Sequence, residues 1–226
     1  MSVHKEAKRI TTQVLHEMKE NGERIAMLTA YDFSMTRLVD QAGIDIILVG
    51  DSASNVMAGH ETTLPITLDQ MIYHASSVVR AAKRALVVVD LPFGTYQGNS
   101  KEALNSAIRI MKESGAHAVK LEGGREVRES IERILSAGIP VMGHVGLTPQ
   151  SIHQFGGYKV QGKTFLDSKQ VRQDAKDLQK AGAFSLVLEG IPQELATEIT
   201  HDLKIPTIGI GAGSKCDGQI LVTHDL

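Results

Sequence analysis

Five short apolar runs that each end at an ionisable residue constrain the fold of this chain more than any other feature. The stretch from Ile44 to Ser52, IDIILVGDS, carries one such run and closes on Gly50 and Asp51. A strand that is apolar on both faces is typical of a buried parallel sheet, in which chemistry lies at the carboxyl ends of the strands. The other four runs are 85–92, which ends at Asp90, 116–123, which ends at Lys120 and Glu122, 140–145, which ends at His144, and 185–190, which ends at Glu189.

The segments between these runs have helical patterns. Apolar residues recur at helical spacing, and a glycine follows the expected end of several segments, as at Gly43, Gly115 and Gly182. Thr67 followed by Gln70 predicts a capping box. We therefore expect helices within 12–21, 34–42, 67–84, 100–115, 125–137, 168–182 and 193–203, with Ser100 and Ser168 as helix caps.

Eight predicted strands alternate with these helices. Besides the five runs above, strands are expected at 25–30, 205–211 and 219–222. Eight parallel strands in regular alternation favour an α/β fold of the closed (β/α)8 TIM barrel type, with an open doubly wound sheet as the alternative. No linker or low-complexity tract divides the chain, so residues 1–226 are expected to form one barrel domain with a short N-terminal helix.

The end of the chain breaks this pattern. Only THDL follows Val222, so we expect the last outer helix of the barrel to be missing from this chain. Either the chain is cut short, or a partner subunit covers that side of the barrel. A bare apolar flank of that size is unusual on a monomer, which favours a homo-oligomer.

The composition excludes several classes of partner. The formal net charge is −2 and no Lys/Arg cluster forms a patch, so nucleic acid is not an expected partner. No apolar run approaches the ~18–20 residues of a membrane span, and the polar start MSVHKEAKRITTQ does not look like a signal peptide. The single cysteine, Cys216, suits a reducing cytoplasm and is most simply a small buried core residue.

Three carboxylates predict a metal site. Asp51, Asp90 and Glu122 follow consecutive strands, so their side chains converge at one mouth of a barrel. Three adjacent carboxylates repel one another unless a cation joins them, and oxygen-only ligands favour Mg²⁺ before Ca²⁺. The alternative is that each carboxylate pairs with a nearby lysine or caps a helix.

Four further residues at the same mouth are candidates for binding and catalysis. Lys120 shares its strand face with Glu122 and can hold a substrate carboxylate or a developing oxyanion, or it can form a salt bridge with Asp90. His144 can donate a hydrogen bond to a ligand, act as an acid or serve a structural role. Ser52 can contact the same ligand. Glu189 lies across the barrel from the carboxylates and is the candidate for a general base.

Two glycine-rich segments need an interpretation. GIGAG at 209–213 does not meet the spacing of a dinucleotide-binding loop, so close backbone packing at the barrel rim is the better hypothesis. The long segment 146–167 after the fifth apolar run is a candidate lid or cosubstrate contact, and a static loop is the alternative.

Eight motifs at the strand ends occur in order along nearly the whole chain. They resemble the ketopantoate hydroxymethyltransferase family, and several are long enough to be specific. The motifs are MLTAYD at 27–32, VGDS at 49–52, DLPFGTY at 90–96, VKLEGG at 119–124, GHVGLTPQ at 143–150, GGYKVQGK at 156–163, LVLEG at 186–190 and GIGAGSKCDGQILVTHD at 209–225.

This resemblance implies a (β/α)8 barrel of the phosphoenolpyruvate/pyruvate type in a homo-oligomer, often a decamer. It implies transfer of a hydroxymethyl group from 5,10-methylenetetrahydrofolate to 3-methyl-2-oxobutanoate, which starts pantothenate synthesis. The implied site follows the motifs. Asp51 and Asp90 would ligate Mg²⁺, with Glu122 in or near its shell. The residues that contact the oxo acid would be Asp51, Ser52, Asp90 and Lys120, with His144 close by. Glu189 would be the general base.

Two other functions stay open at this point. One is C–C lysis through a similar enolate, as in the isocitrate lyase group, which typically relies on a loop cysteine acid. No cysteine lies near the second to sixth predicted strands. The other is a non-catalytic, metal-binding barrel with a role in assembly.

Overall fold

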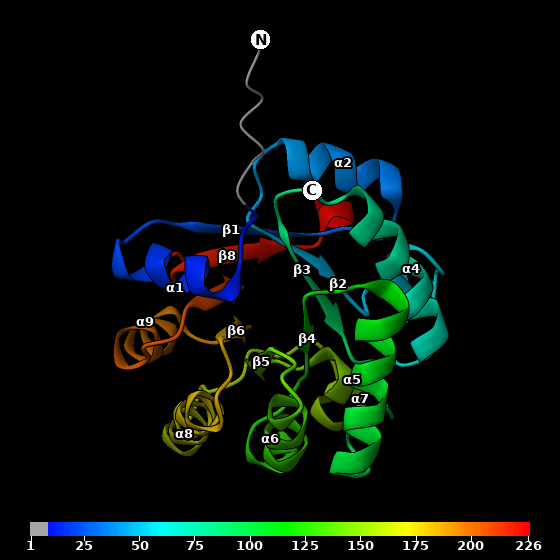
Figure 1. Ribbon diagram of the computed structural model, residues 1–226. Coiled ribbons are helices and arrows are strands. Elements are labelled where there is room, and N and C mark those ends of the chain that lie inside the picture. The colour runs from blue at the N-terminus through cyan, green and yellow to red at the C-terminus, as the bar shows by residue number, and fades with distance from the viewer. Residues whose placement is uncertain (1–8) are drawn as a thin grey trace.

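A computed structural model describes residues 9–226 and contains eight parallel strands closed into a barrel (Figure 1). Each strand pairs with the next in sequence, and the last pairs with the first, which confirms the (β/α)8 prediction over the open sheet. Residues 1–8, part of the polar start of the sequence, lie outside the described residues. The strands are β1 (Ile25–Thr29), β2 (Ile46–Val49), β3 (Leu86–Asp90), β4 (Ala118–Lys120), β5 (Val141–Gly146), β6 (Ser185–Glu189), β7 (Thr207–Ile210) and β8 (Gly218–Leu221).

Helices surround the barrel, and α1 (Thr12–Glu20) precedes it. Short elements lie at the strand ends: α3 (Ala53–Val56), η1 (Arg125–Val127), η2 (Pro149–Ser151), α7 (Ile152–Phe155) and η3 (Thr223–Asp225). Within residues 9–226, no helix has the length and apolar character needed to cross a membrane. The outer helices, one after each of β1 to β6, are α2 (Phe33–Gln41), α4 (Leu68–Ala81), α5 (Ser100–Ser114), α6 (Arg128–Ser136), α8 (Phe165–Ala181) and α9 (Gln193–Asp202).

Two of the three predicted helix caps are wrong. The capping box at Thr67 is confirmed, but Asn99 and not Ser100 caps α5. Thr164 and not Ser168 caps α8, which begins three residues earlier than the predicted start. The first turn of α8 carries the apolar pair Phe165 and Leu166 on its exposed side, so the sequence there lacks the polar outer face that marks a helix.

The alternation of strands and helices fails after β7. Residues 211–217 connect β7 directly to β8 without an α-helix, so the expectation of a helix between every pair of strands is wrong. A side chain at Gly209 would lie 2.9 Å from Cys216 Sγ, which confirms close packing as the role of GIGAG, and Cys216 is buried. Among residues 9–226 no α-helix follows β8, and a groove of about 610 Å³ borders β1 and β8.

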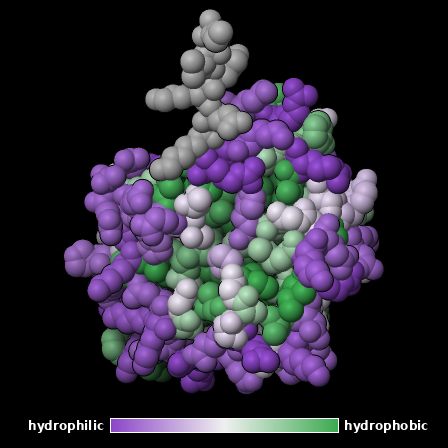
Figure 2. All heavy atoms as spheres, in the orientation of Figure 1, coloured by the Kyte–Doolittle hydropathy of each residue, from purple (hydrophilic) through white to green (hydrophobic). Residues whose placement is uncertain are grey.

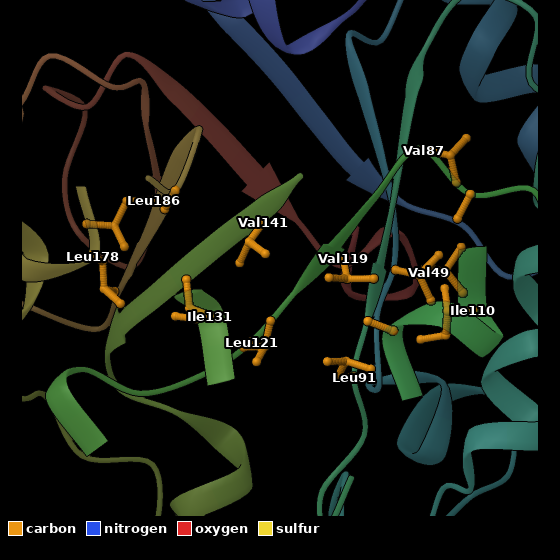
Figure 3. Close-up of a cluster of buried hydrophobic side chains, with 14 of the residues drawn as sticks. Val49, Val87, Leu91, Ile110, Val119, Leu121, Ile131, Val141, Leu178 and Leu186 are labelled. Carbon is orange, nitrogen blue, oxygen red and sulfur yellow. The ribbon is translucent and has the colours of Figure 1, made fainter. Parts of the chain in front are cut away.

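Two apolar layers stabilise the barrel. The outer layer lies between strands and helices, and Figure 3 shows Leu121, Ile131 and Leu178 in it. The inner layer fills the barrel, and α1 closes its amino-terminal end through Leu15, which belongs to the same buried cluster as Ile25. In the view of Figure 2, hydrophobic residues gather toward the centre of the face and hydrophilic residues line its rim.

The inner layer fixes the direction of the site residues. Side chains alternate along a strand, so the residue two positions after an interior residue also points into the barrel. Val88, Ala118, Met142 and Val187 belong to the inner layer. Each is followed two positions later by a site residue, in order Asp90, Lys120, His144 and Glu189.

We predict that Leu15→Ala lowers the free energy of unfolding by about 2–5 kcal/mol, because it leaves a cavity under the barrel. Leu15 is fully buried, whereas Glu20 on the same helix is exposed and serves as a matched control. Urea unfolding of Leu15→Ala and Glu20→Ala measures both changes. Equal stability of the two variants would show that α1 does not close the barrel.

Candidate active site

The carboxyl ends of the strands enclose a cavity of about 480 Å³. One side of it is charged and the other is apolar. The charged side comes from β2 to β6 and comprises Asp51, Asp90, Lys120, Glu122, His144 and Glu189. The apolar side comes mostly from β6 to β8 and comprises Leu48, Val187, Ile210, Ile220 and Val222. The structure therefore brings all the predicted charged residues to one place.

An ion pair lies at the centre of the charged side. Lys120 Nζ lies 3.0 Å from Asp90 Oδ1, and both side chains are buried. The backbone N–H of Asp51 donates a hydrogen bond of 3.0 Å to Asp90 Oδ2. The alternative of a salt bridge between Lys120 and Asp90 is confirmed, and it leaves Lys120 at the cavity wall, where it can also contact a ligand.

In the described part of the chain, neither Asp51 nor Glu122 forms a salt bridge with a lysine or an arginine. Burial, with the neighbouring charge of Asp90, raises the pKa of Asp51 to about 7. Burial, with the charge of Asp51, raises the pKa of Glu122 well above its usual range. Burial alone would lower the pKa of Lys120, but the charges of Asp90, Glu122 and Asp51 outweigh it and raise that pKa. Three carboxylates thus share one ammonium group, and ionising all three is unfavourable without a further cation.

His144 connects Lys120 to Glu189. Lys120 Nζ lies 3.2 Å from His144 Nδ1, and His144 Nε2 lies 3.3 Å from Glu189 Oε2. Burial, with the charge of Lys120, lowers the pKa of His144, so the ring is neutral near pH 7. The side chain of Glu189 is 19% exposed and lines the cavity, so it can reach a bound ligand.

Ser52 lies at the edge of the same cavity. Its hydroxyl oxygen is 2.8 Å from the hydroxyl of Tyr31, which follows β1. A side chain at Gly50 would lie 2.7 Å from Ser52 Oγ, so this turn needs glycine. Ser52 is therefore held where its hydroxyl can contact a ligand.

Several polar residues of the site have no role predicted from the sequence. Gln150 lies within the motif GHVGLTPQ and is buried against Asp51, but it belongs to a glycine-rich loop with no periodic pattern. Tyr96 is buried beside Glu122, and Thr63 lines the cavity wall. Their only sequence signal is membership of the motifs or loops that follow the strands.

The segment 146–167 covers part of the cavity mouth. Tyr158 lines the cavity although its side chain is 63% exposed. The segment also carries η2 and α7, so it is partly structured. Movement of this segment as a lid stays a prediction.

The charge of the cluster fits a divalent cation. Ionised Asp51, Asp90 and Glu122 with protonated Lys120 carry two net negative charges, which a divalent cation would balance. Within residues 9–226, no three His, Cys, Asp or Glu side chains are already gathered as metal ligands. Ligand atoms of this oxygen-only kind favour a hard ion such as Mg²⁺.

We predict that Lys120→Met lowers the free energy of unfolding by about 3–5 kcal/mol, because it leaves Asp90 as a buried charge without its partner. Adding Asp90→Asn should restore part of the loss, since the second change removes that charge. Urea unfolding at pH 7 of both single variants and the double variant gives the coupling. Strictly additive losses would contradict a direct interaction.

Solved structures with low sequence identity share the fold. A phosphonopyruvate hydrolase solved with oxalate and Mg²⁺ superposes with a TM-score of 0.71 at 13% identity and covers 95% of this chain and 81% of that chain. A 2,3-dimethylmalate lyase, titled a member of the PEP mutase/isocitrate lyase superfamily, gives a TM-score of 0.67 at 18% identity and covers 93% and 80%.

Relatives with high sequence identity carry one name, 3-methyl-2-oxobutanoate hydroxymethyltransferase. The relative from Christiangramia forsetii is 68% identical over 222 residues, which cover 98% of this chain and 82% of the relative. The relative from Parabacteroides distasonis is 65% identical over 228 residues, which cover 100% and 84%. The profile of the ketopantoate hydroxymethyltransferase family matches residues 9–226. The chain therefore belongs to the ketopantoate hydroxymethyltransferase family.

Proposed function

We propose that this chain transfers a hydroxymethyl group from 5,10-methylenetetrahydrofolate to 3-methyl-2-oxobutanoate. With water, these give 2-dehydropantoate (ketopantoate) and tetrahydrofolate, the first step of pantothenate biosynthesis. Membership of the family and the shared name of its relatives support this substrate. The observation that carries the mechanism is the division of the cavity into an apolar side and a charged side that includes Glu189.

The two sides match the two ends of the oxo acid. Its carboxylate and ketone oxygens would face the charged side, where Lys120 and Ser52 can donate to them and Asp51, Asp90 and His144 lie close by. Its branched alkyl group would lie on the apolar side, against Val187, Ile210 and Ile220. Burial of two methyl groups there contributes roughly 1–2 kcal/mol of binding free energy at ~0.8 kcal/mol per carbon.

We propose Mg²⁺ as the metal, held by Asp51 and Asp90 with Glu122 in or near its shell. The raised pKa values of Asp51 and Glu122, which a nearby cation would lower, support this assignment. A fold relative whose title names Mg²⁺ with oxalate, itself a small carboxylate ligand, is consistent with it. When bound, the metal would supply Lewis-acid stabilisation of the negative charge that develops on the ketone oxygen.

Glu189 is the proposed general base. It would remove the proton from C3 of the oxo acid, and the electron pair of that C–H bond would attack the one-carbon unit of the folate. Lys120 would stabilise the charge that develops on oxygen. His144 would orient Glu189, because its Nε2 faces Oε2 of that carboxylate.

C–C lysis gains no support from the site. In residues 9–226, Cys216 is the one cysteine, and it does not line the cavity. The cysteine acid on which that alternative relies is therefore not part of the described site.

We also propose a homo-oligomer, with a decamer as the form that the family resemblance implies, and a cytoplasmic location. Exposed apolar side chains on α2 and α4, Phe33, Leu38 and Tyr73, support assembly because such groups usually pack against a partner. Sedimentation velocity should show a large species. A single 24.5 kDa species would contradict assembly.

We predict that Glu189→Gln slows exchange of the C3 proton of 3-methyl-2-oxobutanoate in D₂O by about 10²-fold or more, because the amide cannot accept the proton. NMR without folate follows this step apart from group transfer. His144→Gln should slow exchange less, since we assign His144 to hydrogen bonding. Wild-type exchange in Glu189→Gln together with slow exchange in His144→Gln would reverse the two roles.

We predict that Asp51→Asn combined with Asp90→Asn abolishes Mg²⁺ binding and leaves the barrel folded, because the change removes two like charges from the cluster. Calorimetric titration of Mg²⁺ in the presence of the oxo acid measures binding, and circular dichroism checks the fold. Unchanged Mg²⁺ affinity in the double variant would refute the metal assignment.

A further inference from the structure

Gln150 links two of the three carboxylates through two hydrogen bonds and donates a third to the backbone. Its side-chain Nε2 donates to Asp51 Oδ2 at 2.8 Å and to the backbone oxygen of Leu91 at 3.0 Å. Its backbone N–H donates to Glu122 Oε2 at 2.9 Å. Gln150 is buried, so these bonds do not compete with bulk water.

The orientation of the Gln150 amide is fixed from its other end. Its Oε1 accepts hydrogen bonds from the Tyr96 hydroxyl at 2.7 Å and from Gln97 Nε2 at 2.9 Å. The Tyr96 hydroxyl accepts from the backbone N–H of Glu122, and its proton lies closer to Gln150 Oε1, at an oxygen separation of 2.7 Å, than to the backbone oxygen of Glu122 at 3.2 Å. A flipped amide would place its oxygen against Asp51 Oδ2 and the backbone oxygen of Leu91 and lose both of those bonds.

The loop after β5 has the geometry to bring Gln150 to this place. Gly146 has φ +97°, and a side chain there would lie 2.3 Å from the backbone oxygen of Glu189. The N–H of Leu147 donates to the same oxygen at 2.8 Å. The chain thus turns tightly at the end of β6 and places η2 over the carboxylates that follow β2 and β4.

We infer that Gln150 is a positioning residue that orients Asp51 and Glu122 toward a divalent cation. By holding Asp51 Oδ2 and Glu122 Oε2, it leaves Oδ1 and Oε1 as the oxygens available to the ion. Partners that hold metal-binding carboxylates in this way typically change metal affinity or activity by about 10–100-fold when they are removed. This inference rests on the metal assignment in the proposed function.

Gln150→Met tests the inference, because methionine has a similar length and no hydrogen-bonding amide. The backbone bond from position 150 to Glu122 remains available in any variant, so the test isolates Asp51. We expect the calorimetric affinity for Mg²⁺ alone to fall by about 10–100-fold. The Mg²⁺ concentration for half-maximal turnover should rise by the same factor, while kcat at saturating Mg²⁺ should stay within about threefold of wild type.

Gln97→Met is the matched control. It removes one donor to Gln150 Oε1 but touches neither Asp51 nor Glu122, so Mg²⁺ affinity should stay within about threefold of wild type. A purely structural role for Gln150 would lower the melting temperature and kcat while leaving Mg²⁺ affinity unchanged. Gln150→Asn gives a second measurement if the methionine variant does not fold, since its shorter side chain cannot reach Asp51.

The outcomes separate this inference from the metal assignment. The inference alone would be overturned if Gln150→Met or Gln150→Asn kept the wild-type affinity for Mg²⁺ while the Asp51→Asn and Asp90→Asn double variant lost Mg²⁺ binding. Wild-type affinity in the double variant, or no Mg²⁺ binding by the wild-type protein, would overturn the metal assignment and the inference with it.

Discussion

Buried charge at the carboxyl end of the barrel is the constraint on which the site depends. An isolated charge is costly inside a protein, and a buried ion pair stabilises only when its hydrogen bonds are satisfied. Lys120 offsets one of three carboxylates, so Asp51 and Glu122 keep raised pKa values. The site is therefore a place where the folded chain accepts unfavourable electrostatics, and a bound divalent cation would relieve them.

The opposite end of the barrel compensates for this arrangement. There α1 closes the barrel with Leu15, and apolar side chains fill the interior below the charged layer. The same strands supply both regions because every second residue of a strand points into the barrel. In β3 to β6, an apolar interior residue comes before an ionisable one. Stability and chemistry are thus separated along the barrel axis, with Val88 below Asp90 and Val187 below Glu189 as examples.

This period-two pattern explains which site residues could be predicted from the sequence. Apolar runs and terminal ionisable residues depend on spacing within one strand, so the spacing alone assigns Asp90, Lys120 and Glu189 to the barrel mouth. Gln150 could not be assigned in this way, because its bond to Asp51 joins residues 99 positions apart and depends on a loop without periodicity. Regular alternation up to β7 suggested a further helix before β8, although no helical pattern occurs in residues 211–217, and the structure has none there.

The proposed charge stabilisation by Lys120 and the proposed proton removal by Glu189 meet at His144. An ammonium group has donors only, so His144 Nδ1 must accept from Lys120, and the ring proton of the neutral imidazole then lies on Nε2. That nitrogen lies 3.3 Å from Glu189 Oε2. The cation that would stabilise developing negative charge thus also sets the tautomer of the residue that orients the base. Loss of Lys120 would disturb both functions, because His144 could then carry its proton on either nitrogen.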